Sequence, residues 1–268
     1  MKKAYLGVDV GSVSTNLVVL DESNEVVAAE YLRTSGQPIV TVQQGLYSIG
    51  QKLKGQVEII GAGTTGSARY LSSMIIGADI VKNEITAHAI AASEVVPGVN
   101  TIIEIGGQDS KIIILREGVV TDFAMNTVCA AGTGSFLDQQ ASRLTIDIED
   151  FGNLALQAKN PVRIAGRCAV FAESDMIHKQ QLGYNNEDII AGLCEALVRN
   201  YMNNVGKGKE ILPPVLFQGG VAANQGLVEA FKKYLEMDVI VPPWYDVMGA
   251  IGAALLARRA VEKKKKSS

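Results

Sequence analysis

Short apolar runs separated by polar turns open the chain and predict a meander of strands. These runs are rich in Val, Leu and Ala, a composition typical of strands. The segment that follows, 41–54, has apolar residues at intervals of four, three and four from Val42 to Leu53. That spacing predicts an amphipathic helix. The predicted opening strands are 4–10, 16–20 and 26–32.

The same hydrophobic layout returns about a hundred residues later. Asp9-Val10-Gly11-Ser12 matches Glu104-Ile105-Gly106-Gly107, and in both places a strand leads through an acidic residue and a polar turn into another strand. Such an internal repeat indicates a duplicated unit. Glycines let a backbone approach phosphate closely, and a neighbouring carboxylate suits Mg²⁺. Two ordinary hairpins are the alternative, and the retained acid favours phosphate binding.

Glycines at 61, 63 and 66 spell G-x-G-x-x-G between a predicted strand and a predicted helix. Taken alone this is a dinucleotide-binding fingerprint. The fingerprint normally opens the first strand–helix unit, whereas here it follows a three-strand meander and a helix. We therefore do not assign a dinucleotide site to it.

Helical and strand patterns alternate through the rest of the chain. Pro161 ends one helical pattern, and a strand-to-helix turn at Gly219-Gly220-Val221 is of the kind that receives adenosine or its phosphates. A closing helix with a small-residue face follows at 245–261. The predicted helices are 135–144, 146–158 and 187–205, and the predicted strands are 162–165, 215–217 and 239–241.

Two of the three cysteines stand in matching contexts. Cys129 in NTVCAAGTGSFLD and Cys168 in AGRCAVFAESD each precede a small-residue turn or a predicted helix. Free N–H groups at a helix start favour anions or a negatively charged cofactor. A lone cysteine is otherwise a buried small thiol. Cys194 falls on the apolar stripe of its helix and is predicted to be core, and His88 and His178 are predicted to be surface or core residues.

Composition narrows the class of protein. The chain has 268 residues, 47% hydrophobic and 20% charged, with a net charge of −3. These values indicate a globular protein and argue against nucleic acid or an anionic membrane as the main partner. The start of the chain lacks a signal-peptide pattern and no apolar run is long enough to span a bilayer. With three cysteines, we expect a cytoplasmic protein whose thiols are free or bound to metal.

The repeated hairpins, the GGVA turn and the final Gly-Ala-Gly helix together resemble the actin-like ATPase (ribonuclease H-like) fold, an α/β fold with two similar halves around a nucleotide cleft. Within that fold, EIGGQD, CAAGTGSFLD, CAVFAESD and FQGGVAAN resemble the activators of 2-hydroxyacyl-CoA dehydratases, in the BadF/BadG/BcrA/BcrD ATPase family. That family includes the ATPase subunits of benzoyl-CoA reductase and the reductases of double-cubane cluster proteins. The resemblance implies halves at 1–98 and 99–245, with 246–268 as a closing helix and basic tail that pack back on the first half.

The resemblance also implies an ATP-driven, oxygen-sensitive electron donor. A homodimer would hold one [4Fe–4S] cluster through Cys129 and Cys168 of each copy, and four thiolates are the usual complement of such a cluster. ATP–Mg²⁺ would lie in the cleft. The implied catalytic or metal-positioning residues are Asp9, Glu104, Gln108 and Asp109, with Asp9 as a Mg²⁺ ligand. The implied ATP and ADP contacts are Gly11, Ser12, Val13, Ser14, Gly106, Gly107, Gly132, Thr133, Gly134, Gly219, Gly220, Val221 and Asn224.

Several alternatives stay open at this point. The resemblance implies an iron–sulfur enzyme as the partner, namely a dehydratase, an aryl-CoA reductase or a double-cubane protein. It also implies an electron donor such as ferredoxin or flavodoxin. Glu104 and Asn16 depart from the Asp and Lys usual in dehydratase activators. The rival functions are an actin-like small-molecule kinase without a cluster, with Asp109 as base, and a non-catalytic nucleotide-dependent interaction module.

Overall fold

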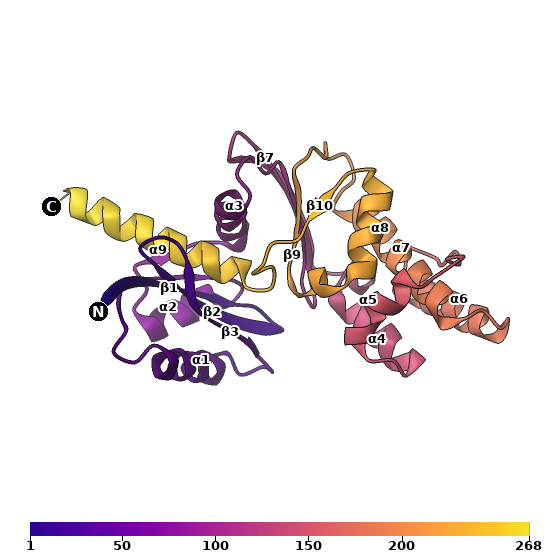
Figure 1. The fold of residues 1–268 in the computed structure, drawn as a ribbon, viewed down its shortest axis with the longest axis horizontal. Helices are drawn as coiled ribbons and strands as arrows, with labels where there is room; N and C mark the ends of the chain where they lie inside the picture. The colour runs from indigo at the N-terminus through magenta and orange to yellow at the C-terminus, as the bar shows by residue number, and fades with distance from the viewer. Residues whose placement is uncertain (268) are drawn as a thin grey trace. The chain divides into compact units, whose positions relative to one another are not determined.

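The computed structural model describes residues 1–267, which form two compact units (Figure 1). The first unit combines Met1–Pro97 with the chain from Asp246 onward, and the second unit is Gly98–Tyr245. Each unit contains a five-stranded sheet. The first sheet has the order β3-β2-β1-β4-β5 and the second β8-β7-β6-β9-β10, so the two units repeat one topology.

The first unit carries the predicted strand meander. Strand β1 pairs antiparallel with β2 and parallel with β4, so the sheet is mixed. Its elements are β1 (Lys2–Val10), β2 (Ser14–Asp21), β3 (Val26–Arg33), α1 (Pro38–Lys52), β4 (Val57–Thr65), α2 (Arg69–Ile76), β5 (Ile80–Val81), α3 (Glu84–Val95) and α9 (Met248–Ser267).

Helices cover both faces of the first sheet. On one face, alternate residues of β1 pack in a cluster with Val42 and Ile49 of α1. On the other face α9 lies so close that a Cβ on Gly7 would stand 1.9 Å from the Ala250 carbonyl oxygen, and one on Gly63 would stand 2.2 Å from that of Ala253. The glycine at 63 in the G-x-G-x-x-G motif therefore serves helix packing.

The second unit repeats the same strand arrangement with more helices. Strand β6 pairs antiparallel with β7 and parallel with β9. Its elements are β6 (Thr101–Ile105), β7 (Ser110–Arg116), β8 (Val119–Asn126), the 3₁₀ turn η1 (Ala130–Gly132), α4 (Gly134–Leu144), α5 (Ile148–Leu156), α6 (Ala169–Gln181), α7 (Asn186–Asn204), β9 (Val215–Gln218), the 3₁₀ turn η2 (Gly220–Ala223), α8 (Gln225–Leu235) and β10 (Val239–Ile240).

Alternate residues of the second sheet face a large apolar core. Ile103 and Ile112 point into this core, where side chains of α4, α5, α7 and α8 meet them. Within this core, Tyr201 and Phe217 each make an edge-to-face contact with Phe231. Burial of these rings and branched side chains is the main stabilising contribution. The helices consequently hold the loops at the ends of β6, β8 and β9 in fixed positions.

One predicted strand is wrong. The segment 162–165 has no strand partner, although Val162 and Ile164 are buried as the alternation required. Its backbone groups bond to helices instead: the Val162 N–H donates to the Asp188 carbonyl oxygen at 3.1 Å, and the Arg199 guanidinium donates to the Ile164 carbonyl oxygen at 2.7 Å. The apolar alternation correctly indicated which side chains are buried, but it did not indicate which groups hydrogen-bond to the backbone of this segment.

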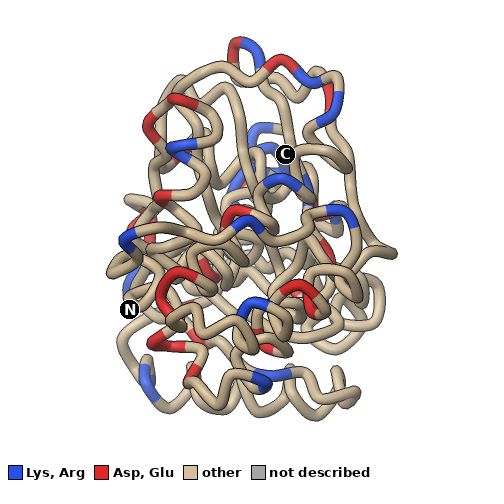
Figure 2. The backbone as a smooth tube through the Cα atoms, turned by 90° about the vertical axis from the view of Figure 1, so that its right-hand side faces the viewer, with Lys and Arg blue, Asp and Glu red and all other residues tan. Residues whose placement is uncertain are grey.

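Charge is mixed along the backbone. Figure 2 shows acidic and basic positions interspersed, and the longest basic run in the sequence is Lys263–Lys266 in α9. Within residues 1–267, none of the helices combines the length and the apolar character needed to cross a bilayer.

Candidate functional site

The two predicted phosphate turns have the same backbone geometry. In the first hairpin the Gly11 N–H donates to the Ser14 carbonyl oxygen at 2.9 Å, and in the second the Gly106 N–H donates to that of Asp109 at 3.0 Å. The register is also the same. In each hairpin, the residue opposite the acid comes two positions after the residue whose carbonyl oxygen accepts this hydrogen bond. The opposed pairs are Asp9 with Asn16, and Glu104 with Lys111.

Two glycines enclose the carboxylate of Asp9, which is half-buried. A Cβ on Gly66 would stand 2.4 Å from Asp9 Oδ1, and one on Gly249 would stand 2.0 Å from Asp9 Oδ2. The same point at Gly249 is 3.3 Å from Cε1 of His88, which is buried on α3 as the sequence allowed. The carboxylate of Asp9 thus lies where only glycines leave room for it. The turn residues beside it are Gly11, Ser12, Val13 and Ser14, of which Ser12 is exposed.

Glu104 lies in a buried ion-pair cluster that the sequence did not predict. Lys111 Nζ is 2.9 Å from Glu104 Oε2 and 2.9 Å from Asp109 Oδ2. Burial raises the pKa of the Glu104 carboxyl above its usual value, and the Lys111 ammonium opposes that rise. Gln108, between them on the turn, is exposed. Lys111 therefore balances part of the negative charge of the two carboxylates at this turn.

The turn after β9 closes over the second hairpin. Gly219 has a φ of +90°, and a Cβ there would stand 2.3 Å from the Ile105 carbonyl oxygen and 3.0 Å from Glu104 Oε1. Gly220 is exposed beside it, and Val221 lies 2.9 Å from the position of a Cβ on Gly134. The structure thus brings Gly106, Gly107, Gly134, Gly219 and Val221 together in the second unit.

Some predicted nucleotide contacts already have partners within the protein. The N–H groups of Gly134 and Ser135, at the start of α4, donate to the carbonyl oxygens of Gly106 and Gly107 at 2.9 and 2.8 Å. The buried Thr133 hydroxyl donates to the Ala130 carbonyl oxygen, and Gly132 is buried beside it. Asn224 Oδ1 caps α8 by accepting from the Leu227 N–H at 2.9 Å. These groups fix the turns in place.

Cys129 and Cys168 are both half-buried, in contrast to Cys194, which is 1% exposed in the core. Cys129 precedes η1, and Asn126 holds it by donating to its carbonyl oxygen at 2.8 Å and accepting from its N–H at 2.9 Å. Cys168 is the residue before α6, and its carbonyl oxygen accepts from the Ala172 N–H at 2.9 Å. Both thiols therefore lie on loops with defined backbones. His178 is exposed on α6.

Asn200 of α7 connects the two cysteine loops, and sequence reasoning missed it. Its Nδ2 donates to the carbonyl oxygens of Gly166 and Arg167 at 2.8 and 3.2 Å, just before Cys168. Its Oδ1 lies 3.0 Å from the position of a Cβ on Gly132, just after Cys129. At 2% exposure, Asn200 is a buried polar residue on a mostly apolar helix face. That contrast was the signal in the sequence.

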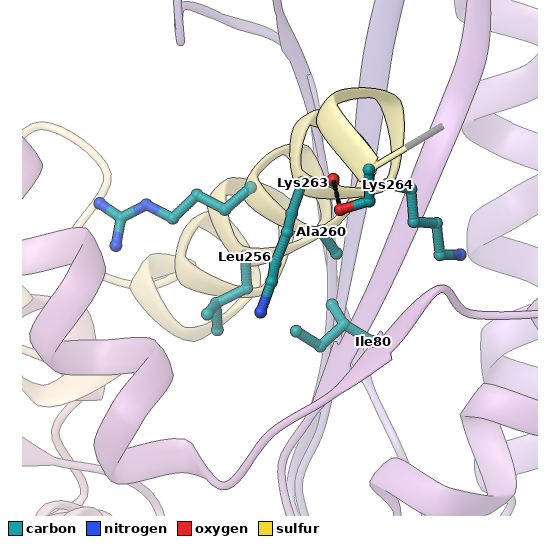
Figure 3. Close-up of a pocket in the computed structure, with 7 residues that line it drawn as sticks. Ile80, Leu256, Ala260, Lys263 and Lys264 are labelled. Carbon is teal, nitrogen blue, oxygen red and sulfur yellow. Dashed lines mark hydrogen bonds between the residues drawn. The ribbon is translucent and has the colours of Figure 1, made fainter.

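Within one copy of residues 1–267, no cluster of three or more His, Cys, Asp or Glu side chains is arranged to hold a metal ion. A groove on the first unit is lined by none of the predicted site residues. Ile80, Leu256 and Ala260 form its apolar floor, and Lys263 and Lys264 line it as well (Figure 3).

The fold of the chain is that of the actin-like ATPases. Two solved structures match nearly the whole chain. The activator of 2-hydroxyisocaproyl-CoA dehydratase from Clostridium difficile with bound ADPNP has a TM-score of 0.88 at 32% identity, over 99% of this chain and 98% of that one. The (R)-2-hydroxyglutaryl-CoA dehydratase component A from Acidaminococcus fermentans has a TM-score of 0.87 at 32% identity, over 97% of this chain and 99% of that one. A ROK family glucokinase from Streptomyces griseus, at 13% identity and a TM-score of 0.56 over 96% of this chain and 99% of that one, shares the fold alone.

The chain belongs to the BadF/BadG/BcrA/BcrD ATPase family, whose model matches residues 6–257. Its relatives include the activator of lactoyl-CoA dehydratase of Anaerotignum propionicum, 36% identical over 97% of this chain and 99% of that protein. A benzoyl-CoA reductase subunit from Thauera aromatica is 30% identical over 63% of this chain and 62% of that protein. The resemblance noted in the sequence is confirmed.

Proposed function

We propose that this chain is an ATP-driven activator that passes one low-potential electron to a partner iron–sulfur enzyme. Two copies would share one [4Fe–4S] cluster through Cys129 and Cys168 of each. The observation that carries the proposal is the pairing of these cysteines. Both are half-buried on ordered loops, both loops contact Asn200, and the third cysteine is buried in the core.

The residues present fit such a group. One copy supplies two thiols, and a two-fold dimer supplies the four that a [4Fe–4S] cluster takes. Cys168 directly precedes a 13-residue helix, whose N-terminal N–H groups favour negative charge. Val128, Val170 and Phe171, next to the cysteines, are exposed apolar residues that a second copy would cover. When bound, the cluster supplies one-electron transfer.

The two hairpin turns would bind ATP or ADP. The carboxylate of Asp9 would hold Mg²⁺ directly or through water, because Mg²⁺ binds through one or two carboxylates plus phosphate oxygens. The Gly11–Ser14 and Gly106–Gly107 turns would contact phosphates, and the Gly219–Val221 turn the adenosine end. Gln108 and Asp109 would orient the attacking water. Hydrolysis at such a site depends on positioning and charge stabilisation.

The relatives support an acceptor enzyme as the partner of this chain. Proteins similar to this chain are named as activators of 2-hydroxyacyl-CoA dehydratases or as a subunit of benzoyl-CoA reductase. We infer a cytoplasmic, oxygen-sensitive homodimer whose acceptor is an iron–sulfur enzyme acting on a CoA ester. Its own reductant would be a small electron carrier such as ferredoxin or flavodoxin.

Iron and acid-labile sulfide per dimer, measured on anaerobically purified protein, test the proposal. We expect about four irons per dimer, lost in Cys129→Ala and in Cys168→Ala but kept in Cys194→Ala, which serves as the matched control. Mass measurement should show a dimer in the iron-loaded wild type. Absence of iron from every preparation, with ATP hydrolysis intact in both variants, would favour a small-molecule kinase instead.

A further inference from the structure

We propose that Lys111 is a positioning residue for ATP hydrolysis: its ammonium group holds Glu104 and Asp109 beneath the turn of the second hairpin. This inference rests on the proposed assignment of that turn to the phosphates of ATP. It assigns Glu104 to the support of the turn and removes it from the candidate ligands of Mg²⁺.

The ion-pair cluster is buried at Glu104 and exposed to solvent at Asp109. Lys111 is 2% exposed and Glu104 is 5% exposed, whereas the side chain of Asp109 is 36% exposed. Lys111 Nζ reaches both carboxylates at 2.9 Å. A buried carboxylate is retained in its charged form only when it is paired and hydrogen-bonded. Lys111 is the buried cation that meets this requirement for Glu104.

The same contacts determine the shape of the turn. Glu104 Oε1 lies 3.6 Å from the position of a Cβ on Gly106 and 3.0 Å from that of a Cβ on Gly219. Asp109 Oδ1 lies 2.9 Å from the same point on Gly106. Both carboxylates are therefore packed close to the Gly106 backbone. A shift of either one moves the turn that would contact phosphate.

Comparison of the two hairpins shows that this cation is particular to the second one. The residue equivalent to Lys111 in the first hairpin is Asn16, since each lies opposite the acid of its own hairpin. The Asn16 amide donates to the Asp246 carbonyl oxygen at 3.3 Å and to Ser14 Oγ at 3.5 Å. The first hairpin therefore has a neutral amide at the position where the second has an ammonium group.

Lys111 also has a fixed backbone. Its carbonyl oxygen accepts from the Tyr201 hydroxyl at 2.6 Å, in the core of the second unit. Rigid support on both its backbone and its ammonium group is what positioning of a reactive turn requires. Asp109, held at its Oδ2 by Lys111, would orient water through its exposed side.

Steady-state ATP hydrolysis by Lys111→Met, measured on the full-length dimer, tests the proposal. We expect kcat to fall about 100-fold, the effect of misplacing a positioned group, while KM for ATP changes less than about threefold. Lys232→Met is the matched control, because Lys232 forms an exposed pair with Glu229 at 2.8 Å. Unchanged kcat in Lys111→Met would overturn the proposal.

The double variant Glu104→Gln with Lys111→Met separates positioning from charge balance. It removes both buried charges, so its melting temperature should return toward that of the wild type while kcat stays low. Recovery of kcat together with melting temperature would overturn the proposal, because Lys111 would then only neutralise Glu104.

Glu104→Gln alone should keep more activity than Lys111→Met, since Lys111 still holds Asp109. Equal loss in these two would assign the effect to Glu104 itself and overturn the proposal.

Failure of the role proposed for Lys111 is distinguishable from failure of the proposed function. Wild-type protein without any ATP hydrolysis would contradict the assignment of the turns to ATP. Wild-type hydrolysis that survives in Lys111→Met would contradict only the role of Lys111.

Discussion

Gly66 and Gly219 occupy equivalent positions in the two units. Each has a positive φ, +86° and +90°, and follows the strand that pairs parallel with the acid-bearing strand of its unit. A Cβ on Gly66 would meet the Val10 carbonyl oxygen and Asp9 Oδ1, and one on Gly219 would meet the Ile105 carbonyl oxygen and Glu104 Oε1. The repeat therefore extends beyond the hairpins to the glycines that close over each acid.

Gly66→Ala is expected to disturb the Asp9 carboxylate. The added Cβ would stand 2.4 Å from Asp9 Oδ1 and 2.5 Å from the Val10 carbonyl oxygen. We predict a loss of about 1–3 kcal/mol in unfolding free energy and at least about a tenfold fall in ATP hydrolysis. Gly50→Ala in α1 is the control, because nothing lies within 4 Å of its Cβ position and alanine favours helix. Full activity in Gly66→Ala would contradict a role for the position of Asp9.

Cys194 should react far more slowly with alkylating reagents than the other cysteines in iron-free protein. Burial raises the pKa of its thiol to about 12. Because only the thiolate reacts, labelling at pH 8 should give two fast modifications per chain, with the third much slower. Mass spectrometry over time measures this. Three modifications at one rate would show that the core around α7 opens easily.

The raised pKa of the Cys194 thiol also predicts that the stability of the fold depends on pH. The folded state holds the Cys194 proton more tightly than the unfolded state, so the stabilisation is complete below the ordinary thiol pKa of about 8.5. It is then lost as pH rises toward 12. Denaturant unfolding between pH 8 and 10 should show a steeper fall for wild type than for Cys194→Ala.

Asn200→Asp is expected to loosen both cysteine loops. The change keeps the size of the side chain but removes the N–H donors to the Gly166 and Arg167 carbonyl oxygens. We predict a loss of about 1–3 kcal/mol in unfolding free energy and faster release of iron to a chelator. Asn203→Asp, at an exposed position of the same helix, is the control. Equal iron retention in the two variants would mean that Asn200 does not support the cysteine loops.

Tyr201→Phe removes the hydroxyl that donates to the Lys111 carbonyl oxygen and keeps the ring packed on Phe231. The carbonyl oxygen then loses this buried donor, so unfolding free energy should fall by about 1–2 kcal/mol. Thermal unfolding measures the change, with the exposed Tyr184→Phe as control. No difference between the two variants would show that the Lys111 backbone does not depend on this bond.

Sequence alone determined the repeat and the matching contexts of Cys129 and Cys168. Apolar strands, an acid and a glycine recur at Asp9 and at Glu104, and this local pattern sets the hairpin geometry because turn shape depends on nearby residues. The contexts of Cys129 and Cys168 likewise precede helical turns, as the structure shows. Of the ranges predicted from hydrophobic period, only 162–165 has a different structure, and no range was predicted for α3 or β5.

Tertiary structure alone decided which distant groups meet. Lys111 is an ordinary strand residue in sequence and becomes the buried partner of Glu104 only when β6 pairs with β7. Asn200 reaches the loop before Cys168 across more than thirty residues, and 162–165 takes its backbone partners from α7. Sequence periodicity reports which side of an element is buried, because burial follows local pattern. It carries no information on which polar groups will pair there, since those partners are set by packing between elements far apart in the chain.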